Sequence, residues 1–276
     1  MQALTNFLKI IRWKNAAIFI ILQILLYFYF FDRKFEISDA WLFLILSILF
    51  FGIFGNIHNN ITDYELDRNK NNFIAFDKTT YLIYTIIFVI LGVILGFTAF
   101  YFTFSPTLLY AILVFPISLG LYNIYLKKLP LLGNLLIAFL TTFAIYVPIA
   151  YAKNIDAHQQ VFYFLLIMSF LLTLIREIIK DLEDANIDRL YGYKTLPVIN
   201  KRWATIIVYG LGLVFFVLLG LSKNTIPTLS FYSILTISII FFALSTKLMS
   251  ENKYHQVSQL IKILMFLGFV IIILLS

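Results

Sequence analysis

Two short acidic segments share one pattern in a chain that has only 14 Asp and Glu among its 276 residues. We call residues 59–67 the first motif and residues 181–188 the second motif. Positions 60, 63 and 67 of the first correspond to 181, 184 and 188 of the second, a constant offset of 121 residues. The spacing i, i+3, i+7 places all three side chains on one face of a helix, where like charges repel, so it predicts a bound cation. The candidate metal ligands are Asn59, Asn60, Asp63, Asp67, Asp181, Asp184 and Asp188.

The types of ligand indicate which cation and which substrate to expect. Carboxylates and carboxamides without thiolates or imidazoles suit Mg²⁺, which commonly shares its ligand shell with a substrate phosphate. Basic side chains near both motifs would bind the phosphate oxygens that the metal leaves uncovered. These are Arg68, Lys70, Lys127, Lys128, Arg176, Lys180, Arg189 and Lys194. Each basic residue alone is equally well explained as a solvated loop residue, but the duplicated acidic pattern is not.

The chain that carries the motifs has the composition of an integral membrane protein. It is 62% apolar and 13% charged, with a mean hydropathy of +0.94. Nine continuously apolar segments are long enough to cross a hydrocarbon core of about 30 Å, and none alternates as a barrel strand would. They cover about 16–31, 40–57, 81–104, 107–125, 131–152, 161–180, 203–221, 227–249 and 260–275. We therefore predict an all-α membrane protein, a nine-helix bundle forming a single domain over 1–276.

The basic residues predict how the bundle is oriented. With nine spans, 17 of the 21 Lys and Arg fall on the side that holds the N-terminus, and the other four are Arg33, Lys34, Lys153 and Lys223. The positive-inside rule makes the first side cytoplasmic, with the C-terminus opposite. Both motifs follow even-numbered helices and so lie on the cytoplasmic face. Because their offset spans four helices, we predict two four-helix parallel repeats plus a ninth helix, with a central cavity open to the cytoplasm.

A diphosphate site at the mouth of an apolar bundle suggests a lipid diphosphate, and prenyl diphosphates fit. Their C–O bond must ionise, which cations at the diphosphate and aromatic faces near the allylic cation would favour. Tyr64, Tyr122 and Tyr125 are candidate aromatic partners, although for any one of them a place in the interfacial aromatic belt is the better explanation.

Other chemistries find little support. The chain has no cysteine, and His58, His158 and His255 have no ligand-spaced partners. An ordinary hydrogen bond is the better explanation of His58. No Ser-His-Asp set, glycine-rich phosphate loop or dinucleotide fingerprint is visible, and nothing predicts a nucleic acid partner.

At these motifs the chain resembles the UbiA superfamily of intramembrane prenyltransferases, whose first motif is Asn-Asp-x-x-Asp-x-x-x-Asp and whose second is Asp-x-x-Asp-x-x-x-Asp. The resemblance covers the whole chain and includes Tyr122 to Lys127, as Tyr-x-x-x-x-Lys, and the stretch Lys194–Pro197. It implies Mg²⁺-assisted binding of a prenyl diphosphate and prenyl transfer to a lipid-soluble acceptor in the membrane. The predicted catalytic residues are Lys127, Lys180 and Arg176. The predicted substrate-binding residues are Arg68, Lys70, Tyr122, Lys127, Lys180 and Lys194.

Residues 176–184 and 55–59 most resemble the branch of geranylgeranylglycerol-phosphate geranylgeranyltransferases. Bacterial homologues occur in that branch, and we expect a bacterial inner membrane. The chain departs from the family pattern at Asn60, where the family has Asp, and at residues 69–73, where a proline and an arginine are missing. Both changes touch the diphosphate side of the site.

Three hypotheses follow for the function. The favoured one is prenylation of geranylgeranylglycerol phosphate or a related glycerol-phosphate lipid. The second is prenylation of an aromatic quinone precursor, which would call for an arginine deeper in the cavity than any helix here supplies. The third is a non-catalytic UbiA-like membrane protein, for which Asn60 is the best argument. If both motifs form one site, the Asp63 and Asp184 carboxylates should lie within about 12 Å of each other, given bridging metal and phosphate.

Overall fold

The computed structural model describes residues 2–31, 38–68, 77–150 and 158–275, and every helix or strand element found in these ranges is a helix. The predicted substrate-binding residue Lys70 lies outside the described residues, as do positions 69–73, where the chain departs from the family pattern. Arg33, Lys34 and Lys153, three of the four basic residues predicted on the side opposite the N-terminus, also lie outside them. The all-α prediction is confirmed.

Nine helices in the described part of the chain are long and apolar enough to cross a membrane, as predicted. They are α2 (Trp13–Phe30), α3 (Asp39–Thr62), α5 (Lys78–Thr103), α6 (Pro106–Ile124), α7 (Leu132–Ile149), α8 (Gln159–Leu190), α9 (Leu196–Leu221), α10 (Thr228–Ser250) and α11 (Tyr254–Leu275). Shorter elements are α1 (Gln2–Ile10), α4 (Tyr64–Asp67), η1 (Leu126–Lys128) and η3 (Ser222–Asn224). The short helix α1 has no counterpart among the predicted segments.

Two helix boundaries differ from the prediction in ways that matter for the site. Helix α8 continues ten residues beyond the expected end near 180. Its apolar membrane span is followed, without a break, by the polar residues of the second motif in the same helix. Helix α9 begins at Leu196 but is interrupted at Asn200, whose φ of −155° and ψ of 99° are not helical. The Asn200 side chain accepts a hydrogen bond from Trp203 N at 3.1 Å, so the uninterrupted helix starts near the predicted residue 203.

The chain divides into two compact units. Unit 1 holds residues 1–28, 33–126 and 147–151, and unit 2 holds residues 29–32, 127–146 and 152–276. The boundary near residue 126 falls between the fourth and fifth spans, where the predicted repeats would meet. The repeat itself stays a prediction.

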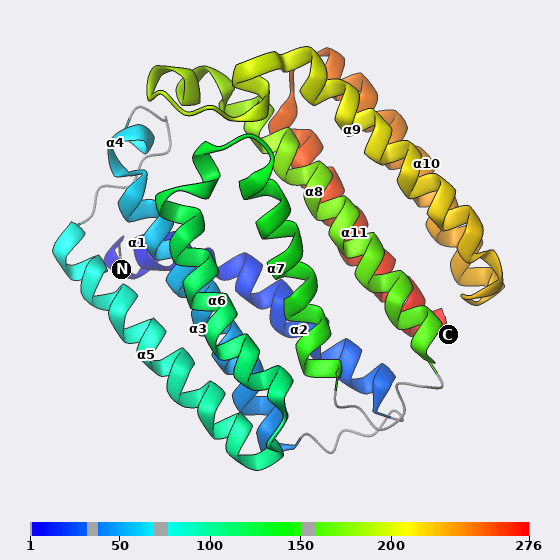
Figure 1. The fold of residues 1–276 in the computed structure, drawn as a ribbon. Coiled ribbons are helices and arrows are strands. Elements are labelled where there is room, and N and C mark those ends of the chain that lie inside the picture. The colour runs from blue at the N-terminus through cyan, green and yellow to red at the C-terminus, as the bar shows by residue number, and fades with distance from the viewer. Residues whose placement is uncertain (1, 32–37, 69–76, 151–157, 276) are drawn as a thin grey trace. The chain divides into compact units, whose positions relative to one another are not determined.

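In unit 1, α3 packs against both α5 and α6, and α5 packs against α6 (Figure 1). Two glycines of α5 permit this close approach. A Cβ added at Gly92 would lie 2.7 Å from Phe51 of α3, and one at Gly96 would lie 2.6 Å from Ile112 of α6. The Ser47 hydroxyl of α3 donates to the Gly92 carbonyl at 2.6 Å, which ties the two backbones together.

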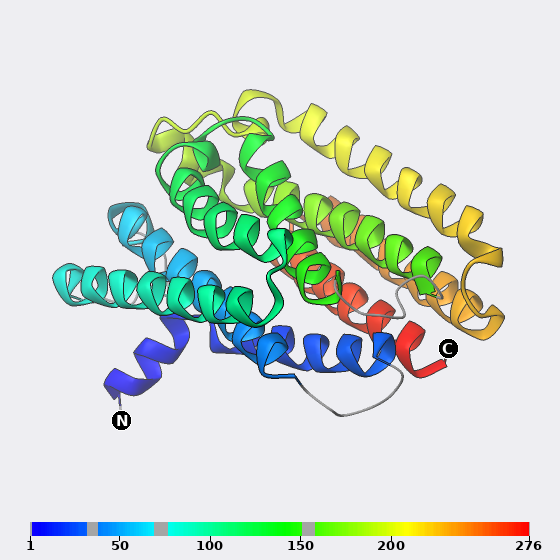
Figure 2. The same cartoon turned by 60° about the horizontal axis from the view of Figure 1, so that its bottom comes forward.

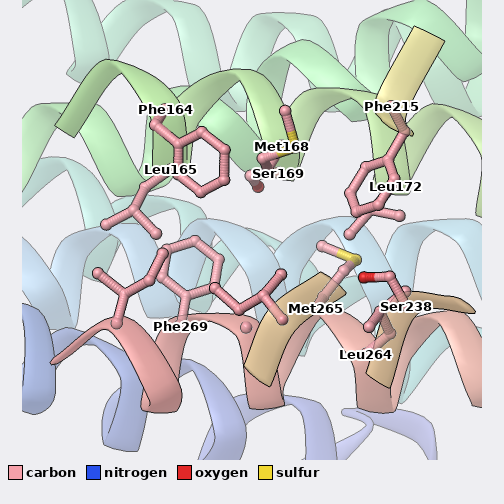
Figure 3. Close-up of a pocket in the computed structure, with 13 residues that line it drawn as sticks. Phe164, Leu165, Met168, Ser169, Leu172, Phe215, Ser238, Leu264, Met265 and Phe269 are labelled. Carbon is pink, nitrogen blue, oxygen red and sulfur yellow. The ribbon is translucent and has the colours of Figure 1, made fainter. Parts of the chain in front are cut away.

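In unit 2, α8 packs against α9 and α11, and α10 packs against α11 (Figure 2). A cavity of about 30 Å³ lies among these four helices, with Phe164, Leu172 and Phe269 in its apolar wall (Figure 3). A second cavity, of about 500 Å³, lies farther along the same helices, lined by residues such as Ile179 and Phe242. No predicted site residue lines either cavity, so neither is the predicted central cavity, which stays a prediction.

The helices that carry the two motifs are the most buried candidate spans of their units. The most apolar window is 61% buried in α3 and 72% buried in α8, whereas it is 22% buried in α5 and 28% buried in α9. The sequence thus places each motif at the end of a helix whose position is fixed by packing on several sides.

Candidate active site

The second motif lies on one continuous helix. Because α8 runs to Leu190, Asp181, Asp184 and Asp188 occupy i, i+3 and i+7 of regular helix and share one face, as predicted. Asp181 and Asp184 are half-buried, and Asp188 is only 7% exposed. Ionisable side chains in this setting are costly unless they bind a partner or serve a function.

Asp181 is held by a residue that the sequence did not point out. The Asn134 amide Nδ2, in the first turn of α7, donates to Asp181 Oδ2 at 2.8 Å, and Asn134 is 6% exposed. A buried amide that fixes one carboxylate oxygen orients the carboxylate, as partners of metal ligands commonly do. The feature of the sequence that could have indicated Asn134 is its place as an isolated asparagine at the start of an apolar segment.

Asp188 is fixed at the junction between α8 and α9. The Thr195 hydroxyl donates to Asp188 Oδ2 at 3.1 Å, and the Tyr193 N–H donates to the Asp188 carbonyl at 2.9 Å. Next to them, the Lys194 N–H donates to the Lys128 carbonyl at 2.9 Å. This bond brings the backbone segments of the predicted substrate-binding residues Lys127 and Lys194 together.

Arg176 and Lys180 are not isolated cations, because one carboxylate joins them. Glu177 Oε1 lies 2.8 Å from Arg176 Nη1, and Glu177 Oε2 lies 2.7 Å from Lys180 Nζ. The Glu177 side chain is 6% exposed, against 23% for Arg176 and 32% for Lys180. The trio holds one net positive charge one turn before Asp181. Glu177 is not among the site residues predicted from the sequence, although it stands between two of them.

The first motif has a different backbone, which corrects the expectation that residues 60, 63 and 67 lie on one continuous helix. Helix α3 ends at Thr62, and Asp63 leaves helical geometry with φ −96° and ψ 9° before the short helix α4. At this helix end the Asn59 carbonyl accepts the last helical hydrogen bond, from the Asp63 N–H at 2.9 Å, and a second one from the Thr62 hydroxyl at 2.9 Å. Asp67 is the last residue of α4.

Two of the three carboxamides before this break, Asn56 and Asn60, contact the end of α1. Asn60 Nδ2 donates to the Ile10 carbonyl at 3.2 Å, and Asn56 Nδ2 donates to the Ile11 carbonyl at 3.2 Å. Asn59, also a predicted ligand, is half-buried.

His58 makes an ordinary side-chain contact, as expected. Its Nδ1 lies 3.2 Å from Asn123 Nδ2, and its ring stacks on Phe54 with centroids 5.6 Å apart. Asn123 also donates to the Gly55 carbonyl at 3.1 Å, so it ties α6 to the end of α3. Tyr122, next to it, is half-buried.

Of the remaining candidates in unit 1, Tyr64 is half-buried, and Arg68 and Tyr125 are exposed. Lys78 Nζ lies 4.1 Å from the ring centroid of Tyr64 and 3.0 Å from Glu65 Oε1. Arg68 has a side chain that is 70% exposed and lies 4.0 Å from Glu65. Tyr125 is 62% exposed, which fits an interfacial tyrosine better than a substrate contact.

Neither unit gathers three or more Asp, Glu, His or Cys side chains into a metal cluster within its described residues. The donor chemistry of the second motif nevertheless fits a hard divalent cation. Its donors are all carboxylates, and Asp181 and Asp188 each have one oxygen oriented by a buried hydrogen-bond donor. Asp63 lies in unit 1 and Asp184 in unit 2, so their predicted proximity stays a prediction.

Solved structures of other proteins share this fold. The structure of a digeranylgeranylglyceryl phosphate synthase in membranes superimposes with a TM-score of 0.73 at 25% identity and covers 100% of both chains. A UbiA homologue from Archaeoglobus fulgidus bound to DMAPP and Mg²⁺ superimposes with a TM-score of 0.65 at 15% identity, over 97% of this chain and 99% of that one. The second likeness shows the fold alone.

Nine helices in the described residues are long and apolar enough to cross a membrane, which defines this protein as an α-helical integral membrane protein. The chain belongs to the UbiA prenyltransferase family, whose model matches residues 15–270. It is 30% identical over 233 residues to the digeranylgeranylglyceryl phosphate synthase of Pyrococcus furiosus, covering 82% of this chain and 81% of that one. It is also 30% identical over 227 residues to the synthase of the same name from Methanosphaera stadtmanae, covering 78% and 80%. These relatives establish it as a prenyltransferase and count against the non-catalytic hypothesis.

Proposed function

We propose that this enzyme transfers a prenyl group from a prenyl diphosphate to a glycerol-phosphate lipid, geranylgeranylglycerol phosphate or a close relative, in a Mg²⁺-dependent reaction. The observation that carries the proposal is the face of α8 where three carboxylates follow directly after the Arg176–Glu177–Lys180 trio. Relatives named digeranylgeranylglyceryl phosphate synthase support the acceptor class, and the Mg²⁺ and DMAPP bound by the Archaeoglobus homologue support the cation and the donor.

In this proposal the acidic and amide residues bind the cation, and the basic residues bind the diphosphate. The predicted ligands hold the cation: Asp181, Asp184 and Asp188 in the second motif, and Asn59, Asn60, Asp63 and Asp67 in the first. Bound Mg²⁺ would supply positive charge at the diphosphate oxygens. Lys127, Lys180, Arg176, Lys194, Arg68 and Lys70 bind oxygens of the diphosphate, where charge develops as it leaves. Tyr122 offers an aromatic face to the allylic carbon.

The proposed reaction breaks the C–O bond between the allylic carbon and the diphosphate and forms a new C–O bond to the hydroxyl of the acceptor. The hydroxyl proton leaves with the diphosphate, so charge and atoms balance. No redox partner or nucleotide is needed.

The position of the cations favours a phosphate-bearing acceptor over an aromatic acid. Arg176 and Lys180 lie directly before the second motif, where they could serve the phosphate groups of donor and acceptor alike. An aromatic acid would instead call for an arginine deeper in the cavity, which no helix interior here supplies. The aromatic quinone precursor remains the second candidate, and the experiment below separates the two.

The test uses the purified full-length protein in detergent with labelled geranylgeranyl diphosphate. One acceptor is geranylgeranylglycerol phosphate and the other is an aromatic hydroxy acid, each with Mg²⁺ or with EDTA. We expect product with the first acceptor only, in Mg²⁺ only, and its loss in Asp184→Asn. Product with the aromatic acid alone would replace the proposed acceptor. Prenyl transfer that is equally fast in EDTA would overturn the metal assignment.

We further propose that both motifs serve one site within a single domain, at the cytoplasmic mouth of a central cavity. The duplicated acidic pattern and the distribution of Lys and Arg between the loops support this. Because the chain has no cysteine, introduced cysteines at 63 and 184 can be tested with a short bifunctional maleimide. Efficient intramolecular cross-linking is expected, since the predicted separation is within about 12 Å. Cross-linking no better than for a pair at 63 and 223 would contradict the single site.

A further inference from the structure

The C-terminal end of α1 is capped by side chains from another helix. The Ile11 N–H and the Arg12 N–H close the last turn on the carbonyls of Phe7 and Lys9, at 3.0 Å each. Arg12 then adopts the left-handed conformation, with φ 55°, and turns the chain into α2. The carbonyls of Ile10 and Ile11 instead accept from the amides of Asn60 and Asn56, one turn apart on α3.

Apolar packing holds the same contact. Ile10 is 4% exposed and packs in a cluster with Ile53 and Ile57 of α3 and Tyr81 of α5. The Phe7 ring lies on the same surface, with its centroid 6.5 Å from that of Tyr81. Helix α1 therefore docks on α3 and α5 through buried apolar side chains and two amide hydrogen bonds.

Asn60 belongs to both the docking contact and the first motif. At this position the chain has Asn where the family resemblance has Asp, and only a carboxamide has an N–H to donate to a carbonyl. An aspartate here would set a carboxylate against the Ile10 carbonyl and leave that carbonyl without its donor. The departure from the family pattern thus has a structural reason in this chain.

We propose that Asn60 is a positioning residue that ties helix α1 to the first motif. Its Nδ2 holds the Ile10 carbonyl, and its Oδ1 is the atom that contributes to the metal site. The second half of this statement rests on the proposed function. Because one side chain serves both partners, docking of α1 and binding of the cation strengthen each other by the same factor.

The first test asks whether Asn60 holds α1. The cysteine-free chain permits a single reporter, Ile10→Cys, whose labelling by a maleimide is slow while α1 is docked. In the full-length protein we expect Asn60→Asp to speed the labelling about tenfold, since a hydrogen bond is lost and a buried acceptor is left unpaired. Asn60→Ala should act in the same direction with a smaller effect. Equal labelling rates with and without Asn60→Asp would overturn the proposal.

A matched control keeps this readout specific. Thr98→Val on α5 removes a hydroxyl that donates within its own helix, to the Ile94 carbonyl at 2.9 Å, so labelling of Ile10→Cys should not change. If Asn60→Asp fails to fold, Asn60→Ala and Asn56→Ala carry the test, and both must speed the labelling for the docking contact to stand.

The second test asks whether docking depends on the cation. Mg²⁺ with a non-hydrolysable prenyl diphosphate analogue should slow the labelling of Ile10→Cys, and Asn60→Ala should abolish that protection. No protection in a protein that still shows Mg²⁺-dependent transfer would overturn the coupling and leave the proposed function standing. If transfer is metal-independent but Asn60→Asp still releases α1, the proposed function fails and the docking role of Asn60 stands.

Discussion

At the scale of single residues, the partners of the predicted ligands matter as much as the ligands. Asn134 orients Asp181, Thr195 orients Asp188, and Glu177 joins two of the predicted diphosphate-binding cations. Each is a buried polar residue whose role follows from what it touches. Two predictions separate these roles.

Asn134→Ala should weaken Mg²⁺ binding rather than chemistry. Loss of the 2.8 Å hydrogen bond leaves the Asp181 carboxylate without its orienting donor. The Mg²⁺ concentration for half-maximal transfer should rise about tenfold, while the rate at saturating Mg²⁺ changes much less.

The control for Asn134→Ala is Thr142→Val on the same helix, whose hydroxyl donates within α7, to the Ala138 carbonyl at 2.9 Å. Thr142→Val should leave the Mg²⁺ dependence unchanged. A folded Asn134→Ala protein with the parent's Mg²⁺ dependence would show that Asn134 has no part in the metal site.

Glu177→Gln should destabilise the protein, because it removes the charge that two neighbouring cations share. Breaking a buried ion pair costs about 3–5 kcal/mol, and we expect about 2–3 kcal/mol here because Arg176 and Lys180 are partly exposed. Thermal unfolding in detergent measures the loss. Glu251→Gln breaks an exposed pair with Lys253 and should have hardly any effect. Equal melting temperatures for the two variants would contradict the buried role of Glu177.

At the scale of the elements, α5 depends on glycine to approach its neighbours. Gly96→Ala should destabilise the protein by about 1–3 kcal/mol, because the new Cβ would lie 2.6 Å from Ile112 and 2.9 Å from Ser47. Gly120→Ala on α6 is the matched control, since nothing lies within 4 Å of its added Cβ. That change should be neutral or slightly stabilising by helix propensity. The comparison is a pair of thermal melts, and a Gly96→Ala protein as stable as Gly120→Ala would refute the close packing.

The helix spans were predictable because composition and length decide them. The boundaries were less so: α8 runs on through the second motif, and α3 stops inside the first, although the spacing of the polar residues is the same. The difference lies in the backbone at Asp63, which leaves helical geometry, and the spacing of the polar residues does not encode that break. The same spacing therefore predicted a continuous helical face in both motifs, and this prediction is confirmed for the second motif and wrong for the first.

At the scale of the whole molecule, the distribution of Lys and Arg between the loops predicts how the protein is oriented in the membrane. Lys223 and Lys253 lie just before and just after α10 (Thr228–Ser250), so they should face opposite sides of the membrane. Single cysteines at these positions in intact cells should react differently with an impermeant maleimide: Lys223→Cys should label and Lys253→Cys should not. The reverse pattern would place the motifs outside the cell and contradict a cytoplasmic active site.

The sequence by itself determined the class of this protein. Apolar runs of membrane-spanning length, the bias of Lys and Arg between loops and two acidic motifs at a constant offset are properties of the linear chain, and they predicted the helical fold and the prenyltransferase family. Only the tertiary structure decided which side chains support the ligands. Asn134 meets Asp181 across 47 residues, and Asn60 meets Ile10 across 50. Such contacts depend on how helices pack, and a polar residue's own neighbours in sequence do not reveal which distant carbonyl or carboxylate it will face.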